Sequence, residues 1–102
     1  MNAPIATRKM LYISPNGERE GITLSIGAPH LSVDGDWACA VALDGFIADL
    51  NEIRGIDSWQ AVELGMHHIA VMTKHYYELG WRFYWERGGE EAKPSELQRK
   101  SE

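Results

Sequence analysis

The feature that most constrains this fold is one long helical segment with a clear start and a clear stop. Asp57 is a favourable N-cap residue, and Gln60 follows it at the spacing of a capping box. Gly80 is suited to the left-handed conformation that commonly ends a helix. The sequence therefore predicts a helix over residues 58–79, about 33 Å long at 1.5 Å per residue.

Two apolar stripes run along this predicted helix at helical spacing. The first is expected to cover a sheet and contains Trp59, Val62, Met66, Ile69, Ala70, Thr73 and Tyr77. The second, weaker stripe consists of Ala61, Leu64, His68, Met72, His75 and Leu79. It has no partner if the helix faces the sheet with the first stripe alone, and contiguous apolar surface usually marks an interface. We therefore predict a homodimer that associates through Leu64, His68, Met72, His75 and Leu79, or through exposed aromatic residues.

Strand-like runs lie on both sides of the helix. Asn16-Gly17 and Asp44-Gly45 each stand between two such runs, and these dipeptides tolerate the positive φ angles of type I′ turns. After the helix, large aromatic residues alternate over residues 81–86. The prediction is an α+β fold: an antiparallel β-meander of about five strands with one long helix packed across one face, in the order β-β-β-β-α-β.

The chain of 102 residues has the length of one domain. Residues 87–102 have no net charge, contain Gly88-Gly89 and carry Leu97 as their main apolar side chain, so we predict a single domain over residues 1–86 and a solvated, disordered tail. We find no apolar run long enough for a transmembrane helix and no secretory signal at the N-terminus. These observations predict a cytoplasmic protein that does not bind membranes.

The charge pattern favours a basic protein as partner. The formal net charge is −5, which argues against a nucleic-acid binder, because neutralising phosphates requires clustered Lys and Arg. Residues 34–63 hold seven acids and one base. Clustered charge of one sign steers a partner of the opposite sign. The predicted docking residues are Asp44, Asp49, Glu52 and Asp57.

Residues that could carry chemistry are few and poorly spaced. Cys39, the one cysteine, lies among alanines on the apolar side of a predicted strand, as a core residue does. His67, His68 and His75 lack the spacing of three or four residues that brings ligands to one ion. We predict no metal, no cofactor and no catalytic residues, hence a non-enzymatic binding protein. The alternative is a small enzyme or ligand-binding domain with a cleft between helix and sheet, using carboxylates, histidines or the aromatic residues at 76–85.

The segment Gly55-Ile56-Asp57-Ser58-Trp59-Gln60-Ala61, with Trp37-Ala38-Cys39-Ala40-Val41 before it, resembles a group of short bacterial proteins of unknown function. They share a Gly-x-Asp-Ser-x-Gln-Ala turn into a long helix. The resemblance implies a small stand-alone α+β domain in bacteria, without assigned activity or catalytic residues. By analogy, a small acidic protein of this kind acts as an immunity partner that neutralises a toxin.

Overall fold

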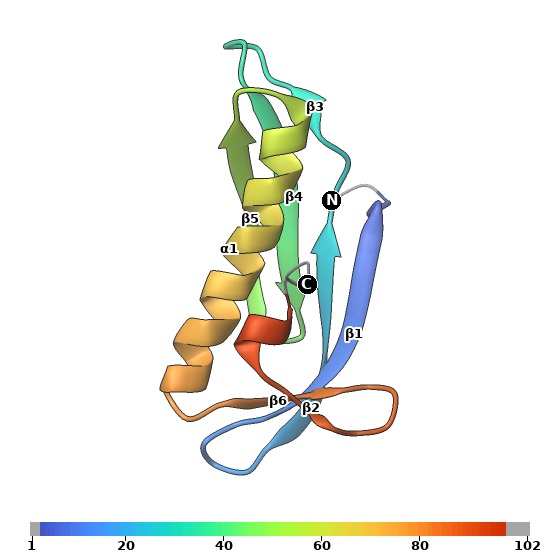
Figure 1. Ribbon diagram of the computed structural model, residues 1–102, viewed down its shortest axis with the longest axis vertical. Helices are drawn as coiled ribbons and strands as arrows, with labels where there is room; N and C mark the ends of the chain where they lie inside the picture. Colours follow the sequence, from blue (N-terminus) through green and yellow to red (C-terminus); the bar gives the residue numbers. More distant parts are fainter. Residues whose placement is uncertain (1–2, 98–102) are drawn as a thin grey trace.

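The computed structural model describes residues 3–97, and for residues 47–50 it describes the main chain only. It confirms the predicted α+β class: a seven-stranded antiparallel sheet with one long helix packed on one face (Figure 1). The elements are β1 (Ala6–Ile13), β2 (Arg19–Ile26), β3 (His30–Leu31), β4 (Trp37–Asp44), β5 (Ile47–Gly55), α1 (Ser58–Glu78), β6 (Arg82–Trp85), β7 (Glu91–Ala92) and the short 3₁₀ helix η1 (Pro94–Glu96).

The strands lie in the order β3-β4-β2-β1-β6-β7, with β5 on the other edge of β4. β4 pairs with β2 through residues 41–44 and with the short β3 through residues 37–38. After the helix, the chain returns to the far side of β1, where β6 and then β7 extend the sheet. The sheet therefore has two strands more than the five predicted, and both additions, β3 and β7, are only two residues long.

The two hairpin turns lie where the sequence predicts them, but they are not type I′ turns. Gly17 and Gly45 have φ angles of +87° and +89°. Among the described residues only glycines have positive φ, so Asn16 and Asp44 do not take the left-handed conformation that type I′ requires of both central residues. One glycine in each turn is sufficient to close the hairpin.

The ends of α1 follow the predicted capping. Asp57 Oδ1 accepts a hydrogen bond of 2.7 Å from Gln60 N, and Gln60 Oε1 accepts one of 2.8 Å from Ile56 N, one residue before the N-cap. At the other end, Gly80 has φ +105° and Trp81 N donates to Tyr76 O at 3.0 Å. These bonds satisfy main-chain groups that a helix end leaves unpaired.

The face that α1 turns to the sheet agrees only in part with the predicted one. The buried helix residues are Ala61, Gly65, Ile69 and Thr73, a line at four-residue spacing. Ile69 and Thr73 belong to the stripe predicted to face the sheet, Ala61 belongs to the second stripe, and Gly65 to neither. Trp59 and Met66, from the stripe predicted to face the sheet, are 79% and 44% exposed. Small side chains hold this position because α1 approaches β4 closely: a Cβ on Gly65 would lie 3.1 Å from Val41 Cγ1.

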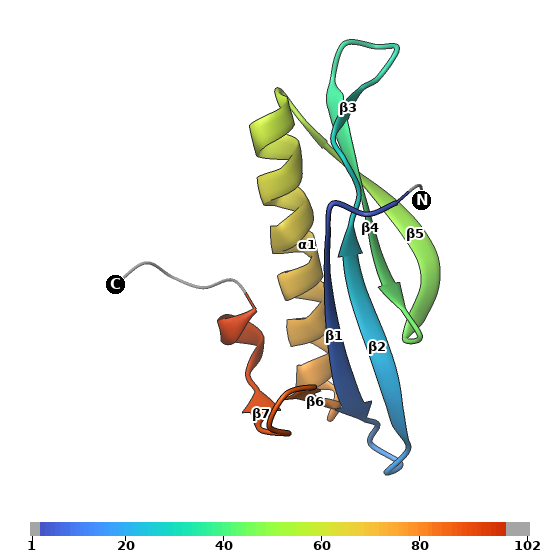
Figure 2. The ribbon, with the colours of Figure 1, turned by 90° about the vertical axis from the view of Figure 1, so that its right-hand side faces the viewer.

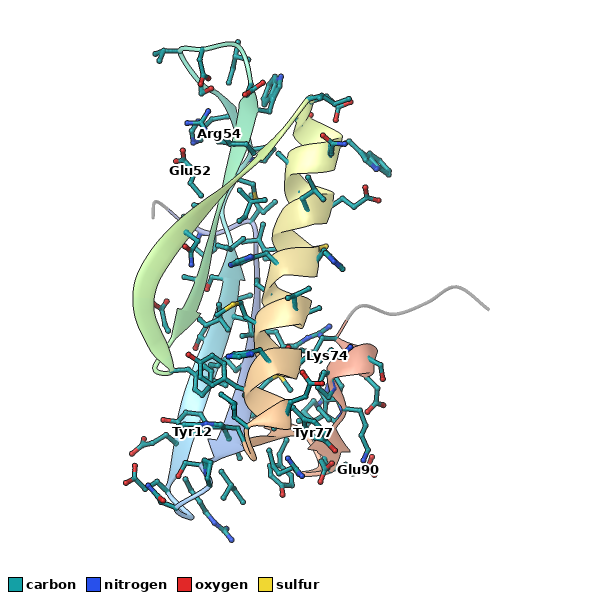
Figure 3. All side chains as sticks on the ribbon, turned by 90° about the vertical axis from the view of Figure 1, so that its left-hand side faces the viewer. Tyr12, Glu52, Arg54, Lys74, Tyr77 and Glu90 are labelled. Atoms are coloured by element: carbon teal, nitrogen blue, oxygen red, sulfur yellow. The ribbon has the colours of Figure 1, made fainter. Side chains whose placement is uncertain are left out.

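The core has an aromatic cluster at the end of the sheet where α1 finishes (Figure 3 labels Tyr12). Phe46 is its centre, with ring centroids 4.6 Å from Tyr76, 4.8 Å from Trp81, 5.2 Å from Tyr12 and 5.6 Å from Phe83. Edge-to-face contacts of this kind add to the burial of the rings. Much of the aromatic sequence after residue 75 is therefore core.

The sequence predicted a solvated tail after residue 86, but part of this segment is packed against the rest of the protein. β7 pairs with β6, Ala92 is 1% exposed, and η1 lies on the same side of the sheet as α1 (Figure 2). Leu97 packs against the core. The packed part of the chain therefore reaches residue 97, while the rest of the predicted tail, residues 98–102, lies outside the described residues.

Candidate protein-interaction surface

The end of the molecule where α1 begins carries four large, exposed apolar side chains. Leu31 is 61% exposed, Val33 109%, Ile56 78% and Trp59 79%. They come from β3, the loop that follows it, the β5–α1 junction and the first turn of α1, which all lie at this end (Figures 1 and 2). We call these four residues the distal surface. Large apolar side chains exposed at the same end of a molecule make that end a candidate site for another molecule.

The loop that carries Val33 is fixed by polar contacts rather than by burial. Arg54 Nη1 contacts both carboxylate oxygens of Asp34 at 3.1 and 3.2 Å and Ser32 Oγ at 3.2 Å. Ser32 Oγ also donates to Asp34, and Ser32 N donates to Asp36 O at 2.7 Å. The Ser32 hydroxyl, followed by the Arg54 guanidinium, holds the pKa of Asp34 below its ordinary value. The loop therefore presents Val33 from a defined conformation.

Glu52 faces away from the helix and is engaged by two neighbours. Its carboxylate lies 3.6 Å from His30 Nε2 and 3.9 Å from Arg54 Nη2, and Figure 3 shows Glu52 and Arg54 on the same part of β5. These side chains are about half exposed, so the pairs contribute little to stability. Arg54 offsets part of the negative charge that the sequence places at Glu52.

The four acids predicted to bind a partner do not form one patch. Glu52 and Asp57 lie toward the distal surface, whereas Asp44 is exposed at the β4–β5 turn. The nine residues of β5 separate the two ends, about 26 Å at 3.3 Å per residue. The side chain of Asp49 lies outside the described residues. Acids that are close in sequence are thus spread between the two ends of the molecule, and Asp34, Asp36, Glu52 and Asp57 are the ones that lie toward the distal surface.

The five residues predicted for self-association divide into two groups. Leu64 and Leu79 are 37% and 58% exposed, and His75 is exposed as well. Met72 packs against the core, and His68 is half-buried with Nε2 buried and without a hydrogen-bond partner in the described part of the chain. A homodimer through this stripe stays a prediction, and light scattering at high micromolar concentration tests it.

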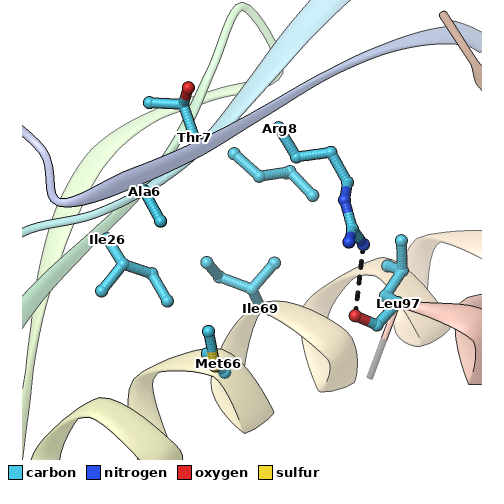
Figure 4. Close-up of a pocket in the computed structure, with 8 residues that line it drawn as sticks. Ala6, Thr7, Arg8, Ile26, Met66, Ile69 and Leu97 are labelled. Carbon is cyan, nitrogen blue, oxygen red and sulfur yellow. Dashed lines mark hydrogen bonds between the residues drawn. The ribbon is translucent and has the colours of Figure 1, made fainter. Parts of the chain in front are cut away.

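A groove opens between α1 and the pair β1–β2, because α1 lies over β4 and β5 (Figure 1). Its volume is about 390 Å³, and its floor is apolar. It is lined by Ala6, Thr7, Arg8, Leu24, Ile26, Met66, Ile69 and Leu97 (Figure 4). Arg8, the charged member of this lining, donates to Leu97 O at 3.2 Å and lies over the Trp85 ring at 5.1 Å. Its guanidinium is therefore already engaged by the protein.

Cys39 is placed as a core residue, as predicted. It is fully buried on β4, its thiol donates to Gly27 O at 3.3 Å, and burial raises its pKa. A reactive thiol requires the opposite environment. Among the side chains that the structure describes, no three His, Cys, Asp or Glu residues gather where they could hold a metal ion.

The fold and these surfaces define a small α+β domain with an exposed apolar surface at one end and an apolar groove beside its helix. A family model matches residues 6–93, and the chain belongs to that family, which is described as a domain of unknown function (DUF6968). The chain matches no solved structure and none of the curated proteins. In the described part of the chain, no helix is long and apolar enough to cross a membrane.

Sequence reasoning missed the residues of the distal surface as a set. They are scattered over residues 31–59, and no sequence window holds more than two of them close together. The available signal was local: Leu31 and Val33 are large apolar residues in a loop-like, acidic stretch, where burial is not expected. Val71, which is 47% exposed near Leu64 and His75, was missed in the same way.

Proposed function

We propose that this chain is a small, acidic, non-enzymatic bacterial protein that acts by binding another protein through the distal surface. The observation that carries the proposal is the exposure of Leu31, Val33, Ile56 and Trp59 at one end. Four large apolar side chains exposed at one end leave apolar area in water that binding would bury. Trp is also enriched among residues that dominate binding energy.

The charge around this surface indicates what kind of partner would bind it. Asp34, Asp36 and Asp57 are exposed beside the apolar side chains, and Arg54 is the base among them. We expect a partner with an apolar centre and a basic rim, whose association is accelerated by these acids and slowed by salt. An immunity-like protein that neutralises a basic toxin fits this description, as the sequence suggested by analogy.

The groove supports the alternative, an enzyme or ligand-binding domain, less well. A cleft that performs chemistry brings several polar groups to one point, whereas the groove has an apolar floor and one charged side chain. That side chain, Arg8, is engaged by Leu97 O and the Trp85 ring. A cytoplasmic location and the absence of metal, cofactor and nucleic acid stay predictions.

Photo-crosslinking in the native host tests the proposal directly. A photoreactive amino acid is placed at Val33 or Ile56, and in a matched control at Leu11, which is 45% exposed on the opposite face of the sheet. We expect Val33 and Ile56 to yield the same adduct with one basic protein, and Leu11 to yield none. Trp59→Ser should reduce that adduct strongly. Equal adducts at all three positions, or adducts at Leu11 alone, would contradict the assignment.

A further inference from the structure

One half of β1 has an unpaired edge. β1 (Ala6–Ile13) pairs with β2 along its whole length, whereas β6 pairs only with Met10–Ile13 on the other side. Among the described strands, none pairs with that side of residues 6–9. Such an edge is a template for another strand.

The register shows which main-chain groups point to this edge. Trp85 N donates to Glu90 O in the β6–β7 hairpin, so the main chain of Trp85 points away from β1. Because these directions alternate along an antiparallel ladder, the residue of β1 that bonds to β6 is Leu11, and Lys9 and Thr7 follow at steps of two. The N–H and C=O groups of Thr7 and Lys9 therefore face the open edge.

Hollows lie beside this edge on both faces of the sheet. On the helix side is the apolar groove of about 390 Å³, to which Ala6 and Arg8 contribute (Figure 4). The side chains of Thr7 and Lys9 lie on the opposite face, and they line a second open hollow at this edge with Glu86, Arg87 and Trp85, whose ring contacts Arg8 on the helix side. Side chains of an added strand alternate between the two faces, so each hollow would receive every second residue.

The charge at the open edge of β1 indicates which kind of segment would pair with it. Arg8, Lys9 and Arg87 outnumber Glu86 there, in a chain with a net charge of −5. A second copy paired edge to edge would bring these cations together with their counterparts, which disfavours self-pairing. An acidic segment has the complementary charge.

We propose that residues 6–9 of β1 accept an extended segment of a partner protein as an added strand, with apolar side chains in the groove alternating with Asp or Glu beside Lys9 and Arg87. The main-chain groups of Thr7 and Lys9 supply the hydrogen bonds, and Met66 and Ile69 of α1 contact the apolar side chains. This site is separate from the distal surface and does not depend on the function proposed for it.

NMR titration of the full chain with a peptide tests this proposal. The probe is a capped eight-residue peptide of alternating Val and Glu, and the comparison peptide has Lys in place of Glu. We expect the first peptide to shift the amide signals of Thr7 and Lys9 and to slow their hydrogen exchange. The free edge of β5 at residues 51–54 should respond less, because Glu52 and Arg54 offset each other there and leave no net positive charge. The Lys peptide should not bind.

Two variants separate strand addition from general charge attraction. Thr7→Pro removes one outward N–H and leaves the β2 ladder bonds of Ala6 and Arg8, so affinity for the Glu peptide should fall about tenfold. Lys9→Glu should weaken binding by about threefold or more, whereas Lys74→Glu, the same change on an exposed helix position, should not.

Several results would overturn the proposal. One is a Glu peptide that binds without protecting Thr7 and Lys9. Another is equal weakening by Lys9→Glu and Lys74→Glu. A third is protection of the two amides that rises with protein concentration in the absence of peptide, which would assign the edge to a second copy. Because Lys9 is exposed, its substitution should leave the fold intact even where Thr7→Pro does not.

Discussion

Replacing Gly55 with alanine tests the contact that joins β5 to the start of α1. A Cβ at this position would lie 2.6 Å from Ala61 N, 2.9 Å from Gln60 C and 3.0 Å from Ala61 Cα. All three are main-chain atoms of the first helical turn. The added methyl group is therefore accommodated only by a shift of the helix, not by rotation of a side chain.

The magnitude follows from two opposing effects. The backbone of Gly55 is outside the left-handed region, so in open space alanine would stabilise the protein by about 0.4–1 kcal/mol through the unfolded chain. Overpacking costs about 1–3 kcal/mol, and a helix shift that weakens the Asp57 cap costs about 1 kcal/mol more. We expect a net loss of about 1–3 kcal/mol, with a fall in Tm of roughly 4–8 °C for each kcal/mol.

Urea unfolding followed by tryptophan fluorescence measures this loss, with the midpoint reporting stability if the slope is unchanged. Gly21→Ala is the matched control: Gly21 is also a strand glycine outside the left-handed region, but a Cβ there would meet nothing within 4 Å. We expect the control to be as stable as the native chain or slightly more stable. A Gly55→Ala variant with a midpoint at or above that of the native chain would refute the close-contact argument.

Three further predictions concern the core and the fixed loop. Ile69→Asp should destabilise the protein by about 3–5 kcal/mol, because it buries an unpaired carboxylate. Met66→Asp should cost less than about 1 kcal/mol, because that side chain is 44% exposed. Comparison of the urea midpoints of the two variants checks the orientation of α1. Because the pKa of Asp34 is lowered in the folded chain, its stabilisation of the 32–36 loop should be present above about pH 4 and lost as pH falls through the folded pKa; amide signals of the loop should show this step, and Asp34→Asn should remove it. The thiol of Cys39 should react with a disulfide reagent at pH 8 only as fast as the chain unfolds, because it is buried and its pKa is raised; rapid reaction of the native protein would contradict its placement.

The sequence predicted the extent of α1 well and its orientation only in part. Helix ends depend on residues that are close in sequence, and Asp57, Gln60 and Gly80 are such residues. The ends of α1 can therefore be predicted from the sequence. The face turned to the sheet depends on how closely the helix approaches β4. Ala61 and Gly65 permit that approach because they are small, and a pattern search for large apolar residues passes over them.

The candidate sites were harder to predict because distance along the chain misleads in a β-sheet. Asp44 and Asp57 are 13 residues apart in sequence, but an extended strand places them at opposite ends of the sheet. The distal surface draws on four separate segments, and the open edge of β1 depends on where β6 stops pairing. Strands of two residues, such as β3 and β7, are defined by their neighbours and carry no pattern of their own.

The turn from β5 into α1 separates residues that build the fold from residues that are exposed to solvent. Gly55 leaves room for the first helical turn, Asp57 and Gln60 make the hydrogen bonds that start the helix, and Ala61 is fully buried. Folding alone therefore explains Gly55, Asp57, Gln60 and Ala61. Between them stand Ile56 and Trp59, whose side chains point to solvent and are free to change without disturbing the core. Substitution of Ile56 and Trp59 would therefore change the exposed surface of the protein without changing the turn that starts the helix.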